Sequence, residues 1–335
     1  KSALIPVDRR YRMPPPASFH PRRQSPRSTS PIGIGYPTWF IVPGFAKDGA
    51  GESGGTVQIR STCKGPAVQT QPRSITSCIR SRWSSEDGRI VSYDASQAEL
   101  RTAALLSGDP TLVSAYENGE DLHRELAVHC EGQQILEHPH FHTGSNTDDP
   151  RQHYKTANFL ILFRGEAPKL AQALLLKCGV IRPLPWCRKV IQGLKELRSG
   201  LWEWQDRIIA QAHRDGYIEL PFIGVSRSFS GKGEKYDINE IVNFPVQSTA
   251  SLVHQRFEAL VSTELGPAST LDDSPILPLA NVYDSSKFDV RSEAHERELD
   301  DIVASASEKL QTTDIWAMLQ DHHGCDRVPF IFEKE

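Results

Sequence analysis

The chain lacks the features that would place it in a membrane or outside the cell. Its 335 residues include only six cysteines, and these show neither C-x-x-C pairs nor the regular spacing of a disulfide framework. No apolar run approaches the roughly 20 residues that a membrane-spanning helix needs. No signal peptide is visible. We therefore expect an intracellular protein with reduced cysteines, no membrane contact and no secretion.

The charge of the chain is unevenly distributed. Residues 1–83 carry a net charge of +10, whereas the remainder carries −14. A basic segment joined to an acidic body suits a protein that touches phosphates with one part and holds cations with another. A disordered basic tail without a partner would give the same balance. Hydrophobic residues make up 38% of the chain, enough for one large domain or two smaller ones.

Strand and helix patterns mix along the chain without a strict βαβ rhythm, which predicts an α+β fold. The first 31 residues are rich in Pro, Arg and Ser, so we expect no packed structure there. Hydrophobic periodicity and turn residues predict the remaining elements. We expect helices over 151–176, 189–213 (weakened at Gly193 and Gly200), 237–264 (broken at Pro245) and 292–314, hairpins over 216–229 and 276–290, and a last strand over 328–332.

The most informative stretch runs from Arg89 to Arg101. Its β-forming residues end on Asp94, and a helical pattern follows as far as Gly108. Ser96 and Glu99 have the spacing of a capping box at the start of that helix. A carboxylate at the tip of a strand, beside a helix N-terminus, is well placed to hold a metal ion. The alternative is that Asp94 is only a helix-start residue.

A second carboxylate follows another predicted strand. Asp284 lies at the turn of the hairpin over 276–290. An aspartate at a tight turn is often just a turn former. Paired with Asp94 on a neighbouring strand, it would instead hold two divalent metal ions for in-line phosphoryl transfer.

One predicted helix presents two cations and two aromatic rings at intervals of four residues. Arg151, Lys155, Phe159 and Phe163 lie along one slowly drifting helix face. Such a face suits a triphosphate at its basic end and a stacked base at its aromatic end. The alternative is a pair of surface cations beside two core phenylalanines.

Two amides are also four residues apart. Asn243 and Gln247 fall on one face of the helix predicted over 237–264. Amides in this arrangement can form hydrogen bonds with base edges or sugars in a minor groove. The alternative is a helix cap near Pro245.

In this order along the chain, the segments resemble the motifs of family A (DNA polymerase I-like) DNA polymerases. Asp94–Arg101 resembles motif A, Arg151 to Phe163 resembles motif B, the fingers helix, and Tyr283–Ser285 lies where motif C belongs. The resemblance covers roughly residues 55–335. Smaller matches are Gln69–Pro72 with Arg80 before motif A, Gly216–Glu219 and Gly224 with Arg227 between motifs B and C, and Asn243 with Gln247 in the primer–template helix.

The resemblance implies a DNA polymerase I-like palm, an antiparallel sheet with helices, plus helical fingers. Residues 56–335 would form palm and fingers, with the fingers at about 115–215, and residues 1–55 would be a disordered or partial N-terminal segment, a truncated thumb or linker. The implied enzyme is a DNA-directed DNA polymerase, a nucleotidyltransferase of replication or repair. Its partners would be primer–template DNA, dNTPs and accessory replication proteins, in the cytoplasm of a bacterial or virus-infected cell.

The resemblance also implies catalytic roles. Asp94 and Asp284 would bind two Mg²⁺ ions. Arg151 and Lys155 would hold the incoming triphosphate, and Lys155 would donate a proton to the leaving group.

Further roles follow for the nucleotide and DNA. Phe159 would pack on the sugar, Phe163 would support the nascent base pair, and His123 would lie near the triphosphate. Glu99 would be the steric gate that excludes a ribose 2′-hydroxyl. The primer–template contacts would come from Arg80, Arg227, Asn243 and Gln247.

The chain departs from the family pattern at several positions. Ala95, Ala98, Phe163, Arg164 and Ser285 stand where the family usually has Tyr, Ile, Tyr, Gly and Glu. We interpret Ser285 as a change that tunes activity, while Arg164 puts a long side chain after the aromatic that meets the base pair. The rival hypothesis is a catalytically impaired, polymerase-derived nucleic-acid-binding module. A third is an unrelated α+β metal-dependent phosphotransferase.

Overall fold

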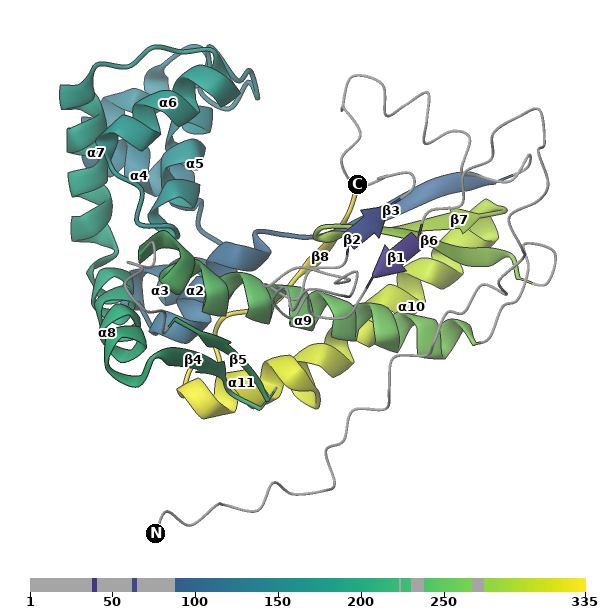
Figure 1. Cartoon of the computed structure of the whole chain (residues 1–335). Coiled ribbons are helices and arrows are strands. Elements are labelled where there is room, and N and C mark those ends of the chain that lie inside the picture. Colours follow the sequence, from purple (N-terminus) through teal and green to yellow (C-terminus); the bar gives the residue numbers. More distant parts are fainter. Residues whose placement is uncertain (1–37, 41–61, 65–87, 223, 230–237, 267–273) are drawn as a thin grey trace, which may run out of the picture.

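The computed structural model describes residues 38–40, 62–64, 88–222, 224–229, 238–266 and 274–335 (Figure 1). Apart from β1 (Thr38–Phe40), which pairs with β2 (Thr62–Lys64), the predicted N-terminal segment 1–55 lies outside the described residues. So do Gln69–Pro72 and Arg80. The rest forms a lobe built on a sheet and a lobe made of helices, which confirms the α+β class.

The central sheet is antiparallel. Its order is β6-β7-β3-β8, with β6 (Ile276–Val282), β7 (Ser285–Val290), β3 (Arg89–Ala95) and β8 (Phe332–Lys334). β6 and β7 form the predicted hairpin, whose turn is Tyr283 and Asp284. The last strand was predicted too early, at 328–332: Pro329 has no N–H to give to a ladder, and Val328 and Phe330 on either side are buried in the core instead.

Two helices, α9 (Ile238–Leu265) and α10 (Glu293–Thr312), cover one face of the sheet (Figure 1), and α11 (Ile315–His323) packs against α2, α9 and α10. Phe257 of α9 stacks on Phe332 of β8 with ring centroids 3.5 Å apart. The expected break at Pro245 is wrong, because α9 continues through it. Pro245 and its neighbours Phe244 and Val246 are buried, and this packing offsets the lost backbone hydrogen bond.

The connection from the sheet to the first helix differs from the predicted one. β3 leads into α2 (Ala98–Ser107), which ends at Gly108 with φ +63°, as expected for a helix C-cap. Its N-cap is Gln97 in a left-handed conformation, without a side-chain cap bond. The predicted Ser96–Glu99 capping box is therefore wrong. The backbone of Ser96 is used elsewhere, because its N–H donates to Ile331 O (2.9 Å) and its carbonyl accepts from Arg101 Nε (2.8 Å).

The helical lobe follows α3 (Pro110–Glu117) and stands apart from the sheet in Figure 1. It contains α4 (Leu122–Glu131), η4 (Gln133–Glu137), α5 (Pro150–Ile161), α6 (Ala167–Cys178) and α7 (Leu184–Leu197). α8 (Ser199–Asp215) returns the chain to the sheet lobe, where β4 (Tyr217–Leu220) and β5 (Val225–Ser228) form the predicted hairpin. Among the described helices, none is long and apolar enough to cross a bilayer.

Two helices that we predicted as continuous are each divided. The pattern over 151–176 splits into α5 and α6, because Arg164 has φ +51° and Gly165 N donates back to Leu160 O. The pattern over 189–213 splits at Arg198, between α7 and α8. Neither predicted weak point is the break: a Cβ on Gly193 would lie 2.9 Å from Cys130 Sγ, and one on Gly200 would lie 3.0 Å from Asp109 Oδ2. These glycines permit close helix packing.

Candidate active site

Two carboxylates meet at one end of the central sheet. Asp94 is the next-to-last residue of β3, and Asp284 is the turn residue immediately before β7. The two strands are antiparallel neighbours in which Asp94 pairs with Ser285. Ala95 N donates to Asp284 O at 2.8 Å, which fixes the turn against the end of β3. The two predicted metal ligands, which are 190 positions apart in the sequence, therefore lie beside each other.

The environment of Asp94 is unfavourable for its charge. Burial, then the charge of Asp284, raises the pKa of Asp94 to about 6; Glu335 and Glu333 act in the same direction and Lys287 opposes them. Paired carboxylates with few neutralising partners suit a divalent cation, and their oxygens are the ligands that Mg²⁺ prefers. No group of three or more His, Cys, Asp or Glu side chains forms a complete metal site within the described ranges. The two-carboxylate set fits Mg²⁺ bound partly through water and substrate phosphates.

Glu99, the predicted steric gate, lies in the first turn of α2, just beyond the carboxylate pair, and is half-buried. The β3–α2 connection that carries it is anchored on both sides. Gln97 Oε1 accepts a hydrogen bond from the Tyr116 hydroxyl (3.2 Å), and the Arg101 guanidinium lies 4.5 Å from the Tyr116 ring centroid. Arg101 Nη1 also donates to Pro329 O (2.8 Å).

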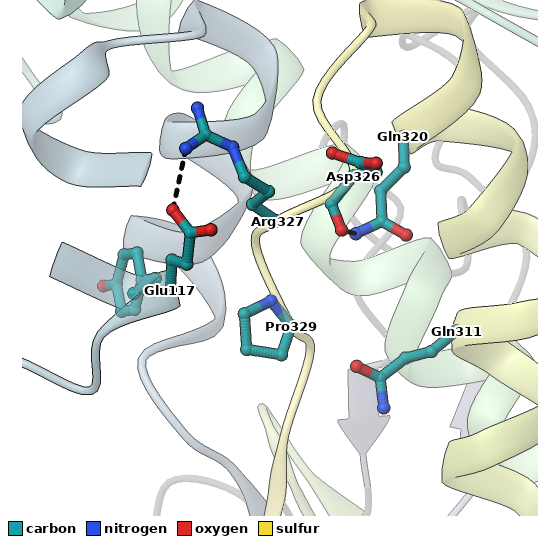
Figure 2. Close-up of a pocket in the computed structure, with 7 residues that line it drawn as sticks. Glu117, Gln311, Gln320, Asp326, Arg327 and Pro329 are labelled. Carbon is teal, nitrogen blue, oxygen red and sulfur yellow. Dashed lines mark hydrogen bonds and ion pairs between the residues drawn. The ribbon is translucent and has the colours of Figure 1, made fainter. Parts of the chain in front are cut away.

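A polar pocket of about 320 Å³ lies on the other side of Tyr116. Figure 2 shows the ion pair that crosses its edge, in which Arg327 Nη1 lies 2.7 Å from Glu117 Oε2. The other lining residues are Gln311, Gln320, Asp326 and Pro329. None of the predicted site residues lines this pocket.

The second group of predicted site residues lies in the helical lobe. Arg151, Lys155 and Phe159 share one face of α5. Lys155 is exposed. Arg151 is half-buried, and its Nε lies 2.5 Å from Oδ2 of Asp121, the N-cap residue of α4. One of the two predicted triphosphate-binding cations is therefore already paired with a carboxylate.

His123 is buried beside this helix face, and its ring centroid lies 6.4 Å from that of Phe159. Burial, together with the charges of Arg151 and Lys155, lowers the pKa of His123 to about 4 against the opposing effect of Asp121. The imidazole is thus neutral at neutral pH. Asn158 Nδ2 lies 3.2 Å from His123 Nδ1 and from two backbone carbonyl oxygens, and it shares its two hydrogens among these three acceptors. Nδ1 is therefore the acceptor, and Nε2 carries the proton.

Phe163 and Arg164 lie in the turn after α5. Phe163 is half-buried against the core. The guanidinium of Arg164 stacks 4.0 Å from the Trp202 ring centroid and pairs with Asp206 at 2.7 Å. Its Nε donates to Gln205 Oε1 at 2.6 Å. Arg164 is therefore directed onto α8, and does not continue the face formed by Arg151, Lys155 and Phe159.

The predicted DNA-binding residues have different environments. Asn243 and Gln247 are both half-buried on α9, one turn apart, and Asn243 Oδ1 is buried without a hydrogen-bond partner in the described part of the chain. Arg227 is already engaged: it pairs with Glu240 at 2.6 Å and lies 4.9 Å from the Phe229 ring centroid.

The structure thus collects the predicted residues into two groups, one on the sheet and one on the helical lobe. Within the described ranges, no hydrogen bond or ion pair joins Arg151 or Lys155 to Asp94 or Asp284. Three neighbours that shape these groups were not predicted: Asp121, Asn158 and Lys287. Each carries a weak signal in the sequence, as a helix-start acid, an amide among apolar helix positions and a cation within a predicted strand.

An antiparallel sheet with helices on one face, a carboxylate pair at one end and a separate helical lobe define a polymerase-type α+β fold. The same fold occurs in the POL domain of Pol1 from M. smegmatis, solved as a complex with DNA primer-template and dNTP. The likeness has a TM-score of 0.60 at 21% identity, and it covers 83% of this chain and 45% of that one. Residues 54–315 match the model of DNA polymerase family A. The chain belongs to this family.

Curated relatives agree with this assignment. The DNA polymerase of Mycobacterium phage D29 is 28% identical over 198 residues, which is 57% of this chain and 28% of the phage protein. DNA polymerase I of Aquifex aeolicus is 28% identical over 197 residues, 59% of this chain and 32% of the relative. The matched part therefore spans under a third of either relative.

Proposed function

We propose that this chain carries the nucleotidyl-transfer site of a DNA-directed DNA polymerase, which adds dNTPs to a primer 3′-hydroxyl under the direction of a template. The observation that carries the proposal is the placement of Asp94 and Asp284 beside each other at one end of adjacent strands, in a member of DNA polymerase family A. Carboxylates brought together in this way are suited to a two-metal clamp.

Asp94 and Asp284 would hold two Mg²⁺ ions. When bound, the ions supply the positive charge that makes the primer 3′-hydroxyl more acidic and stabilises the pyrophosphate leaving group. The two carboxylates differ in exposure, since Asp94 is half-buried and Asp284 is exposed. Asp94 is the more rigidly held ligand, because it lies within the β3 ladder.

The α5 face would bind the nucleotide. Lys155 is exposed and free to contact the triphosphate and to donate a proton to the departing pyrophosphate. Arg151 would exchange Asp121 for phosphate oxygens, which bind a guanidinium well. Neutral His123 would donate a hydrogen bond from Nε2. Phe159 would pack on the sugar.

Selection and template binding would use the remaining residues. Phe163 would support the nascent base pair, and Glu99 would exclude a ribose 2′-hydroxyl. Asn243 and Gln247 would contact primer–template DNA, with Arg80 and Arg227 as further contacts once Arg227 leaves Glu240. Replication or repair in the cytoplasm of a bacterial or virus-infected cell, with accessory replication proteins, is the setting we propose.

Single-nucleotide extension of a labelled primer–template in Mg²⁺ tests the proposal. We expect extension with the matched dNTP and not with the corresponding rNTP, and loss of extension in Asp94→Ala. Extension that survives in Asp94→Ala would refute the assigned site. Salt-dependent DNA binding without extension would instead support a binding module, a second function favoured by the Arg151–Asp121 pair, which occupies a proposed triphosphate ligand.

A further inference from the structure

A buried lysine lies on the same face of the sheet as the carboxylate pair. Lys287 of β7 pairs in register with Ser92 of β3, and the next pair on this face is Ser285 with Asp94. Side chains at alternate strand positions share a face, so Ser92, Asp94, Ser285 and Lys287 point to one side. Only 2% of Lys287 is exposed, whereas lysines are almost never fully buried without partners.

The ammonium group is held in a defined position. Lys287 Nζ donates to Ser92 Oγ at 2.9 Å and to Ser285 Oγ at 3.2 Å. A Glu335 carboxylate oxygen lies 3.8 Å away. Ser92 lies two residues before Asp94 on β3, and Ser285 pairs with Asp94 across the ladder. The ammonium group is therefore held within the sheet, next to the carboxylate site.

The charge of Lys287 reaches Asp94. Lys287 stands diagonally across the β3–β7 ladder from Asp94, because it pairs with Ser92, two residues before Asp94 on the same face. Lys334 provides a useful contrast, because it lies on β8 and pairs in register with Tyr93. Its Nζ lies 2.8 Å from Asp300 and 2.6 Å from Glu296, both on α10. Lys334 therefore faces the opposite side of the sheet.

We infer that Lys287 is a positioning residue of the metal site: its fixed positive charge offsets the charge of Asp94 without metal and weakens the site's affinity for divalent cations. The inference rests on the proposed function and deepens it. A site that binds divalent cations weakly by itself needs the negative charge of a triphosphate to be filled. Lys287 thereby couples metal binding to nucleotide binding.

Direct Mn²⁺ binding to the full chain tests the inference without any catalytic step. Free Mn²⁺ is measured by electron paramagnetic resonance for the wild type, Lys287→Met and Lys334→Met. We expect Lys287→Met to bind Mn²⁺ more tightly by on the order of tenfold, the size of effect that repulsion between a unit charge and a divalent ion has at short range in a partly solvated site. Lys334→Met should bind like the wild type, although it loses the same charge.

Two further variants keep the test decisive. Lys287→Gln removes the charge but keeps donors for Ser92 and Ser285, so it replaces Lys287→Met if that variant does not fold. Asp94→Asn in the Lys287→Met background should abolish the tighter binding, which locates it at the carboxylate pair. Unchanged affinity in both Lys287 variants, an equal gain in Lys334→Met, or a gain that survives Asp94→Asn would each overturn the inference.

Primer extension, measured alongside Mn²⁺ binding, distinguishes failure of this inference from failure of the proposed function. A wild type that extends primers, combined with Lys287 variants of unchanged Mn²⁺ affinity, would overturn the inference alone. Tighter Mn²⁺ binding in the Lys287 variants of a protein that extends no primer would support the inference and count against the polymerase activity.

Discussion

At the scale of single residues, Asp94 is a position where folding and chemistry conflict. Its carboxylate is half-buried next to Asp284, and its pKa is raised to about 6. Because this value lies above that of the unfolded chain, the folded state binds the proton more tightly. Ionised Asp94 therefore destabilises the fold above about pH 6, and the cost is relieved as the pH falls below that value. The proposed metal ligand, which must be charged to bind metal, is thus held where charge is unfavourable.

Asp94→Asn should stabilise the metal-free protein at pH 7.5 while it abolishes incorporation. The expected gain in the free energy of unfolding is on the order of 1 kcal/mol, discounted because the group is half-exposed. The gain should shrink toward pH 4, where Asp94 is protonated in the wild type. Urea denaturation at several pH values measures it. Asp301→Asn, at an exposed position of α10, is the control and should leave both properties unchanged. A variant less stable than the wild type at pH 7.5 would contradict the argument.

Asp121 restrains a second residue of the proposed site. It caps α4 by accepting from His123 N and Arg124 N, and it also holds Arg151. Asp121→Asn keeps a good capping residue but removes the charge. We expect the KM for dNTP to fall by about threefold, because Arg151 no longer has to leave a carboxylate, a change of under about 1 kcal/mol. Steady-state extension kinetics measure it.

The control for Asp121→Asn is a second aspartate that also caps a helix and pairs with an arginine, far from the proposed site. Asp314 is the N-cap of α11 and pairs with Arg256 at 2.7 Å. Asp314→Asn should leave the KM for dNTP unchanged. A rise in KM for Asp121→Asn would instead mean that the carboxylate orients Arg151 for the triphosphate.

At the scale of elements, the join between α7 and α8 depends on one buried ion pair. Arg198 is 1% exposed and pairs with Glu125 of α4. Its Nη1 also donates to Thr111 Oγ1 of α3 at 2.8 Å. The residue thus ties the helical lobe to the sheet lobe at the point where the chain passes between them.

Glu125→Leu should destabilise the protein by about 3 kcal/mol, because it leaves a buried guanidinium without its carboxylate. Glu264→Leu is the matched control, since Glu264 pairs with the half-exposed Lys309 on the surface. That change should cost under about 1 kcal/mol. The urea concentration at the midpoint of unfolding distinguishes the two variants, provided that the m value, the slope of the free energy of unfolding against urea concentration, is unchanged. An equal loss in the free energy of unfolding in both variants would show that the Arg198–Glu125 pair stabilises the protein no more than a surface ion pair does.

The prediction of helices and strands from the sequence was accurate for the hairpins and inaccurate for two helix boundaries. The two hairpins follow from alternating patterns and turn residues, and the structure confirms them. The divisions at Arg164 and Arg198 were both missed, although Gly165 and Pro168 mark a new helix start just after Arg164. Each is held in a non-helical conformation by partners distant in the sequence, Trp202 and Asp206 for Arg164 and Glu125 for Arg198. Tertiary contacts of this kind leave no local pattern, whereas Gly165 and Pro168 are a local signal that the prediction overlooked.

The candidate site shows the same limit. The order of the motifs predicted Asp94 and Asp284 as partners, and the register of β3 and β7 brings them together. The residues that adjust the site, Asp121 and Lys287, were not predicted. Their importance arises from what they contact across elements, which a single sequence does not display.

At the scale of the whole molecule, charge is divided between a basic N-terminal segment and an acidic body. Residues 84–335 carry a net charge of −14, and such a body repels the DNA backbone. Within the basic segment, residues 1–37 alone contain seven Lys and Arg side chains and one Asp. For the proposed primer–template binding, residues 1–83 are the largest source of positive charge in the sequence.

Removal of residues 1–37 should weaken primer–template binding by more than about tenfold at 100 mM salt and flatten its salt dependence, because fewer counterions are released. Fluorescence anisotropy over a range of salt concentrations measures both quantities. Replacing the same seven cations by Gln in the full-length chain is the control for lost length, and it should match the truncation. Extension at saturating DNA should be retained in both variants, because the carboxylate pair and the α5 face lie outside the removed segment. Unchanged affinity and slope would mean that the basic segment has no part in binding DNA.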